Sequence, residues 1–107
     1  MPKISVVIPT HRRFELLKRL MSSLAEQNYD KSNFECILVA TEGDEAFRLG
    51  QDRSLWPDLN YQVTFIPNDP KEGRSASAKR NYGVDLAKHD WIAFVDDDCV
   101  ADPNWLF

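Results

Sequence analysis

Three consecutive carboxylates, Asp96-Asp97-Asp98, directly follow the apolar run Trp91-Ile92-Ala93-Phe94-Val95. Like charges this close together disfavour joint ionisation, so a compensating partner is expected, and a divalent cation is the simplest one. Carboxylate oxygens suit Mg²⁺ and Mn²⁺, which commonly complete their coordination with substrate phosphates. Asp96 and Asp98 are therefore predicted metal ligands in a site for a diphosphate. The alternative is a solvated loop that caps a helix near Pro103.

Polar side chains also follow two other apolar runs. Thr10-His11-Arg12-Arg13 comes after the first run, and Thr41-Glu42-Gly43-Asp44 comes after the second. Because ligands of open parallel sheets collect at the carboxyl ends of the strands, these segments are expected to share one crevice with the aspartates. His11 is either a surface side chain or a ligand of a base or ribose, and the arginines are either solvated charges or phosphate ligands.

A glycine-containing turn at Gly73 precedes a predicted helix that carries Arg80. The backbone N–H groups at a helix N-terminus favour anions, although this signal alone is weak. Arg80 is either a surface charge or a partner of the acidic cluster and its substrate.

A parallel sheet must position these groups, and the apolar pattern predicts one. Strands are expected over 4–8, where Pro9 ends the first strand, and over 34–40, 61–66 and 91–95. Turn formers from Pro67 to Gly73 predict that the chain leaves the sheet there. The alternation of strands with helices predicts an α/β, doubly wound architecture.

Two helices should flank this sheet. The first is expected from Phe14 to Gln27, with Thr10 as its cap and an apolar stripe at Leu16, Leu17, Leu20, Met21 and Leu24. The second is expected over 75–87, where small residues on one face allow close packing on the sheet: Ala76, Gly83 and Ala87. One or two helical turns are expected over 45–49, and a turn or helix after Asp102-Pro103.

The composition excludes several other classes of protein. The 107 residues, 43% of them hydrophobic, fit one domain over 1–107. A net charge of -4 offers no electrostatic footprint for nucleic acid. No apolar run approaches the roughly 20 residues that cross a bilayer, and the first residues lead into a strand, so a cytoplasmic location is expected. Cys36 and Cys99 lack metal-ligand spacing and are expected as reduced thiols in or beside the core.

Three motifs in order resemble family 2 glycosyltransferases of the GT-A fold. Ser5-Val6-Val7-Ile8-Pro9-Thr10 is similar to their first strand, Arg80-Asn81-Tyr82-Gly83 to their Arg-Asn-x-Gly segment, and Phe94-Val95-Asp96-Asp97-Asp98 to their D-x-D strand end. With Pro103 and Leu106 the resemblance spans nearly the whole chain. It implies the nucleotide-sugar-binding N-terminal part of a glycosyltransferase, with a Rossmann-like, mostly parallel sheet truncated after the D-x-D strand.

The resemblance also implies site roles. Pro9, Thr10 and Arg12 would border the nucleoside, Arg80 and Asp97 would approach the nucleotide, and Asp96 and Asp98 would frame the ribose and a Mn²⁺ or Mg²⁺ ion. Glu42 is a further nucleotide-sugar ligand, but it is the only carboxylate directly before Gly43, where the family commonly has an acidic pair. The base preference, often uridine in the family, therefore stays open.

The implied activity is transfer of a sugar from a nucleoside diphosphate sugar to an acceptor hydroxyl. The acceptor half and the catalytic base are expected beyond Phe107, so no residue is nominated as catalytic. The 107-residue chain is expected to be inactive alone and to expose apolar surface that could drive self-association. One alternative is a sugar nucleotidyltransferase, although Thr10-His11-Arg12-Arg13 lacks the glycine-rich loop it would need. The other is a Rossmann-like module that binds a cation without catalysis.

Overall fold

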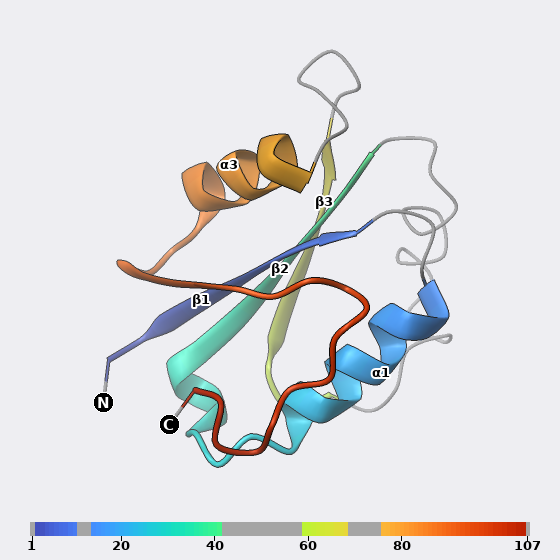
Figure 1. The fold of residues 1–107 in the computed structure, drawn as a ribbon. Helices are drawn as coiled ribbons and strands as arrows, with labels where there is room; N and C mark the ends of the chain where they lie inside the picture. The colour runs from blue at the N-terminus through green and yellow to red at the C-terminus, as the bar shows by residue number, and fades with distance from the viewer. Residues whose placement is uncertain (1, 11–13, 42–58, 69–75, 107) are drawn as a thin grey trace.

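The computed structural model describes residues 2–10, 14–41, 59–68 and 76–106. In this part of the chain a four-stranded sheet has the order β3-β2-β1-β4, and each neighbouring pair runs parallel. The strands are β1 (Ile4–Thr10), β2 (Phe34–Thr41), β3 (Gln62–Asn68) and β4 (Trp91–Phe94). The predicted α/β architecture with a mostly parallel sheet is confirmed (Figure 1).

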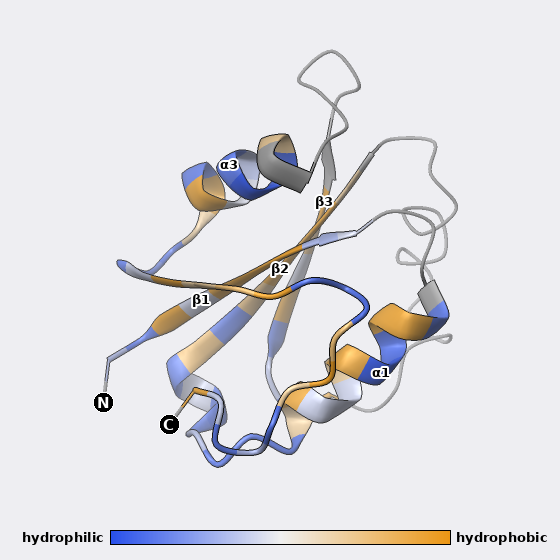
Figure 2. Ribbon diagram, viewed as in Figure 1, coloured by the Kyte–Doolittle hydropathy of each residue, from blue (hydrophilic) through white to orange (hydrophobic). Residues whose placement is uncertain are grey.

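The helices α1 (Phe14–Ala25) and α3 (Ala76–Leu86) lie on opposite sides of the sheet (Figure 1). The apolar stripe of α1 is confirmed: it buries four side chains fully, and only Leu16 stays half-buried. Each fully buried aliphatic side chain contributes roughly 1.5–3 kcal/mol to folding. The stripe packs on alternate residues of the two central strands, which Figure 2 shows as largely hydrophobic: Val6, Ile8, Cys36 and Leu38.

Gly83 explains how α3 comes close to the other face of the sheet. A Cβ atom at this position would lie 2.5 Å from Val7 Cγ1 and 3.3 Å from Val39 Cγ2. No side chain fits in that space unless the helix or the valines move. The predicted close packing through Gly83 is therefore confirmed.

Two strands continue past the prolines that were expected to end them. β1 continues through Pro9 to Thr10, paired with β2 as far as Ala40. Val7 O accepts from Val95 N on the β4 side, and pairing with β4 ends at Val7. Pro9, two residues after Val7, also faces the β4 side. Because β4 no longer pairs with β1 at this point, the missing N–H of the proline costs no sheet hydrogen bond. Likewise β3 runs through Pro67 to Asn68, because β3 is an edge strand and tolerates a proline.

The predicted helix cap at Thr10 is wrong, because Thr10 belongs to β1 and its hydroxyl is engaged elsewhere. A 3-10 turn, η1 (Lys31–Asn33), was not expected from the sequence; Asp30 caps it by accepting from Ser32 N. The Ser32 hydroxyl also donates to Asp30 Oδ1, and the two bonds, from the hydroxyl and from the N–H, lower the pKa of Asp30. The predicted turns over 45–49 and the glycine-containing turn at Gly73 lie outside the described residues.

The segment after β4 is tied to the end of α1. Gln27 is buried, and its side-chain amide donates to Asp102 O (2.5 Å) and accepts from Leu106 N (3.0 Å). Ala101 N donates to Ser23 Oγ at 2.9 Å. The expected turn at Asp102-Pro103 is confirmed by the bond from Trp105 N to Asp102 O. This attachment holds the C-terminal end of the acidic turn, and β4 anchors its N-terminal end.

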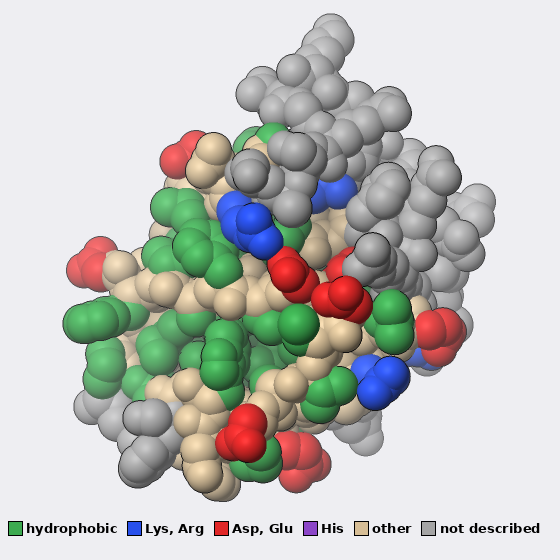
Figure 3. All heavy atoms as spheres, in the orientation of Figure 1, with side chains coloured by type: hydrophobic (Ala, Val, Ile, Leu, Met, Phe, Trp, Pro, Cys, Tyr) green, Lys and Arg blue, Asp and Glu red, His purple; other side chains and the backbone are tan. Residues whose placement is uncertain are grey.

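The outer side of β4 carries exposed apolar side chains. Figure 3 shows hydrophobic side chains gathered over β4 and the segment that follows it. Trp91 is 66% exposed and Phe94 is 47% exposed. Among the described residues, no helix has both the length and the apolar character that a membrane crossing needs.

Candidate functional site at the carboxyl ends of β1 and β4

The strand order creates a switch point between β1 and β4. The chain adds β2 and β3 on one side of β1 and then returns to place β4 on the other side. Ligands of open α/β sheets bind outside the carboxyl ends of the strands at such a point. Thr10 ends β1, and Asp96 to Asp98 follow β4, so these four predicted site residues meet at this position.

The three aspartates occupy a tight turn and have different surroundings. Cys99 N donates to Asp96 O at 3.1 Å and closes the turn. Asp97 is only 5% exposed, whereas Asp96 and Asp98 are exposed. Protein groups supply part of the compensation that was expected from a cation. The cation expected at Asp96 and Asp98 stays a prediction.

A buried hydrogen bond joins the two strand ends. Thr10 Oγ1 donates to Asp97 Oδ2 at 2.9 Å, across 87 residues of sequence. Thr10 itself is 1% exposed. A bond to a charged acceptor is stronger than one between neutral groups, and leaving a buried carboxylate without it is costly. Thr10 and the acidic turn are thus on the same rim of the sheet, as the predicted site requires.

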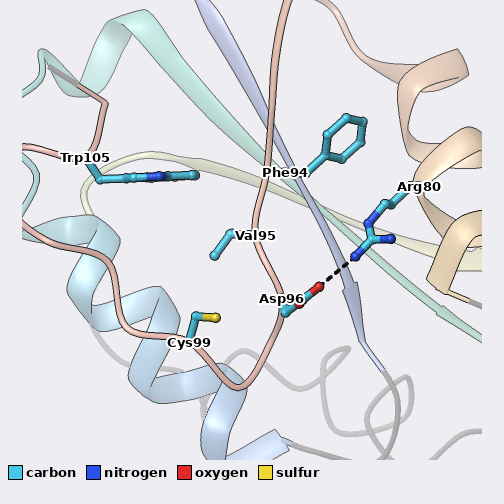
Figure 4. Close-up of a pocket in the computed structure, with 6 residues that line it drawn as sticks. All are labelled: Arg80, Phe94, Val95, Asp96, Cys99 and Trp105. Atoms are coloured by element: carbon cyan, nitrogen blue, oxygen red, sulfur yellow. Dashed lines mark hydrogen bonds and ion pairs between the residues drawn. The ribbon is translucent and has the colours of Figure 1, made fainter.

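Arg80 of α3 contacts the first aspartate of the turn. Its Nη2 atom donates to Asp96 Oδ1 at 2.8 Å, and the two side chains are 35% and 57% exposed. An ion pair this exposed adds little stability. Its effect is on geometry: Figure 4 shows the guanidinium directed from α3 toward the carboxylate. The predicted association of Arg80 with the acidic cluster is confirmed.

An open hollow of about 460 Å³ lies beside this ion pair. Phe94 and Val95 point to opposite sides of the chain, and Trp105 lies on the Val95 side (Figure 4). Apolar walls with a few charged groups are typical of small-molecule sites. The lining residues are Arg80, Phe94, Val95, Asp96, Cys99 and Trp105.

Lys79 is a residue of this region that the sequence analysis did not single out. Its side chain is 1% exposed, and its Nζ atom donates to Thr10 O at 2.8 Å. The signal was present in the spacing, because Lys79 lies four residues before Gly83, one helical turn along the face that touches the sheet. A lysine on that face must be buried.

Cys99 was expected in or beside the core and is instead exposed, whereas Cys36 is buried as expected. Cys99 Sγ lies 3.7 Å from Asp98 Oδ1 and donates to it. Desolvation, with the charge of Asp98 as the next cause, raises the pKa of the Cys99 thiol. Both cysteines are free thiols, as predicted.

The donor set suits a metal only in part. Among the described residues, no group of three or more His, Cys, Asp or Glu side chains is arranged to hold an ion. Mg²⁺, however, is usually bound through one or two carboxylates together with substrate phosphates and water. The exposed carboxylates of Asp96 and Asp98 fit that kind of shared site.

Of the remaining predicted site residues, Pro9 is buried in β1 next to Thr10. Arg12 and Glu42 lie outside the described residues, as do His11 and Arg13. The convergence expected for Thr10, Arg80 and the aspartates is therefore observed, and the contribution of Arg12 and Glu42 remains a prediction.

Comparison with known proteins identifies the class that this fold and site define. The model of the family described as glycosyl transferase family 2 matches residues 5–107, and the chain belongs to this family. A glucosyl-dolichyl phosphate glucuronosyltransferase of Haloferax volcanii is 32% identical over 106 residues, which cover 97% of this chain and 32% of that protein. The match favours the glycosyltransferase interpretation over both alternatives raised from the sequence.

Solved structures agree on the GT-A fold. S. aureus TarS 1-349 in complex with UDP superposes with a TM-score of 0.71 at 26% identity, covering 97% of this chain and 30% of that one. The mannosyltransferase PcManGT from Pyrobaculum calidifontis, in complex with GDP-Man and Mn²⁺, has a TM-score of 0.70 at 19% identity, with 92% and 28% covered. This chain spans about a third of the length of the curated relatives it matches.

Proposed function

We propose that the protein transfers a sugar from a nucleoside diphosphate sugar to an acceptor hydroxyl and that this chain binds the donor. The observation that carries the proposal is the hydrogen bond from Thr10 to Asp97, which brings the ends of β1 and β4 together at the switch point. Family membership and the UDP complex of TarS support it.

The site residues have distinct parts in this proposal. Thr10 and Pro9, with Arg12 and Glu42, border the nucleoside. Arg80 offers a planar, permanently charged guanidinium next to Asp96, suited to an anionic group of the donor. Asp97 is buried, accepts from Thr10 through Oδ2 and fixes the shape of the turn. We assign no residue of this chain as the base that takes the acceptor proton.

Asp96 and Asp98 would hold a Mn²⁺ or Mg²⁺ ion together with the donor diphosphate. The Mn²⁺ in the PcManGT complex supports this choice of cofactor. When bound, the ion would supply Lewis-acid stabilisation of the charge on the departing diphosphate. Because two carboxylates alone make a weak site, metal and nucleotide binding should depend on each other.

Isothermal titration calorimetry tests the proposal directly. UDP, UDP-GlcNAc and GDP are titrated into the chain with and without Mn²⁺. We expect at least one nucleotide to bind, and to bind only when Mn²⁺ is present. In Asp98→Asn the affinity should fall by about tenfold or more, because one charged ligand is lost. Asp90→Asn is the matched control, since Asp90 is an exposed aspartate that precedes the other end of β4.

Two outcomes would contradict the proposal. Binding of Mn²⁺ that no nucleotide changes would indicate a cation-binding module without donor recognition. If Asp98→Asn and Asp90→Asn affect nucleotide binding equally, the acidic turn is not part of the binding site.

A further inference from the structure

The buried ammonium group of Lys79 needs an explanation beyond packing. Lys79 is among the largest fully buried side chains of the chain, at 1% exposure. Taking an ammonium group out of water is costly unless other groups compensate its charge. An apolar side chain of similar length would fill the same space between α3 and the sheet without that cost.

Lys79 contacts a backbone carbonyl at the functional end of the sheet. Lys79 Nζ donates to Thr10 O at 2.8 Å, which connects the first turn of α3 to the last residue of β1 across 69 residues of sequence. Through its hydroxyl, the same threonine donates to Asp97 Oδ2 at 2.9 Å. Thr10 therefore has a buried cation on its carbonyl side and a buried carboxylate on its hydroxyl side.

Two consecutive residues of α3 thus reach the acidic turn by different routes. Arg80 contacts Asp96 directly, in a largely solvated ion pair. Lys79 acts through Thr10 on Asp97, and every group on this second route is at most 5% exposed. Buried contacts are screened much less by salt and water than exposed ones, so the second route is the stiffer of the two.

We propose that Lys79 is a positioning residue: it holds Thr10 so that Asp97 anchors the turn and the carboxylates of Asp96 and Asp98 face the ligand. Lys79 itself is too buried to touch a ligand. The part of the inference that concerns ligand affinity rests on the proposed function. The part that concerns the order of the turn does not.

The test compares Lys79→Met with a matched variant, Glu35→Gln. Methionine keeps a long apolar side chain and removes the donor. Glu35 is also a buried charged residue, at 2% exposure, but it lies near the opposite end of the sheet, where it accepts from Ser5 Oγ (2.7 Å) and Lys88 N (3.0 Å). Urea denaturation of both variants measures how much each loses in general stability.

The first readout is the affinity for UDP in the presence of Mn²⁺. Lys79→Met is expected to weaken binding about tenfold, and Glu35→Gln less than about twofold, even where the two lose similar stability. Lys79→Gln, which keeps a neutral donor, should fall between wild type and Lys79→Met, and it also serves if the methionine variant does not fold. Equal affinities in the lysine and glutamate variants would overturn the proposal.

The second readout needs no ligand. Amide hydrogen exchange of a peptide containing residues 95–99 should be several times faster in Lys79→Met or Lys79→Gln than in Glu35→Gln, because only the lysine variants loosen the turn. If wild type binds no nucleotide, the proposed function fails, while this exchange comparison still decides the role of Lys79. Equal exchange in all variants would refute the positioning role.

Discussion

At the scale of single residues, the acidic cluster is three side chains with three tasks. Asp96 orients toward Arg80, Asp97 is buried against Thr10, and Asp98 remains exposed beside Cys99. A turn of four residues makes this division possible, because consecutive side chains point in different directions. The positive charge of Arg80, which could compete with a metal ion, contacts Asp96. Asp98 is therefore the residue whose replacement tests the metal site most cleanly.

Cys99 reports on the charge of Asp98. Because the pKa of the thiol is raised, less thiolate is present at a given pH and alkylation should be slow, increasing as the pH rises. Replacing Asp98 by Asn removes a negative neighbour, so the pKa should fall and the reaction with iodoacetamide at constant pH should become faster. Mass spectrometry of the labelled protein measures the rate.

The thiol experiment has an internal and an external control. Cys36 is buried and its pKa is raised by burial, so it should stay unlabelled in the native protein. Asp90→Asn changes the net charge by the same amount as Asp98→Asn but at a position that is not next to Cys99, so it should leave the alkylation rate unchanged. An unchanged rate in Asp98→Asn would show that the carboxylate does not influence the thiol.

At the scale of secondary-structure elements, α3 is the element on which the site depends. It packs against β1 through Gly83, donates through Lys79 to Thr10, the last residue of β1, and contacts the acidic turn through Arg80. A shift of this helix away from the sheet would therefore disturb all three connections together. The C-terminal segment has the complementary task of holding the turn from the α1 side, through Gln27.

Gly83→Ala is expected to destabilise the protein although alanine favours helix formation. The gain in helix propensity is about 1 kcal/mol, whereas forcing a methyl group against Val7 and Val39 costs typically 1–3 kcal/mol. We therefore expect a net loss of up to about 2 kcal/mol in urea denaturation, with weaker nucleotide binding. Asp85→Ala, at an exposed position of the same helix, should stay within about 0.5 kcal/mol of wild type. A stabilised Gly83→Ala would mean that α3 does not pack this closely.

At the scale of the whole molecule, both helices share one sheet. The radius of gyration of the chain, 12.8 Å, agrees with the roughly 13 Å typical of a compact chain of this length. A buried network at the end of the sheet remote from the site adds to this cohesion: Ser5 donates to Glu35, and His89 N donates to Ser5 Oγ. The link between α3 and β4 is thereby attached to β1 and β2.

The chain should therefore unfold in a single cooperative transition. Circular dichroism follows the helices and the sheet, whereas tryptophan fluorescence includes Trp91 and Trp105, which lie on the exposed side of β4 and in the segment after it. We expect the two signals to give the same midpoint in urea. Sedimentation at the same concentrations controls for association through the exposed apolar side chains. A fluorescence transition that precedes the other would mean that β4 detaches on its own, and the prediction of one domain over 1–107 would then be wrong.

Much of this protein was determined by local pattern in the sequence. Continuous apolar runs predicted the four strands, helical spacing predicted the stripe of α1, and the order of elements predicted the α/β class, because burial against a sheet imposes these periodicities on the chain. The strand ends were less predictable: Pro9 and Pro67 were expected to end strands, but whether a missing N–H matters depends on which neighbour it faces.

Only the tertiary structure decided how the site is assembled. Thr10 and Asp97 are 87 residues apart, and Lys79 reaches Thr10 from a third element, so no local pattern could pair them. From the sequence, Asp96 and Asp98 were predicted to bind a metal and Asp97 to approach the nucleotide. Thr10 was predicted to cap a helix and border the nucleoside, and Lys79 was not singled out. Their actual tasks follow from burial and from the position of β4 beside β1, since only these determine which charges are removed from water and which partners are close enough to compensate them.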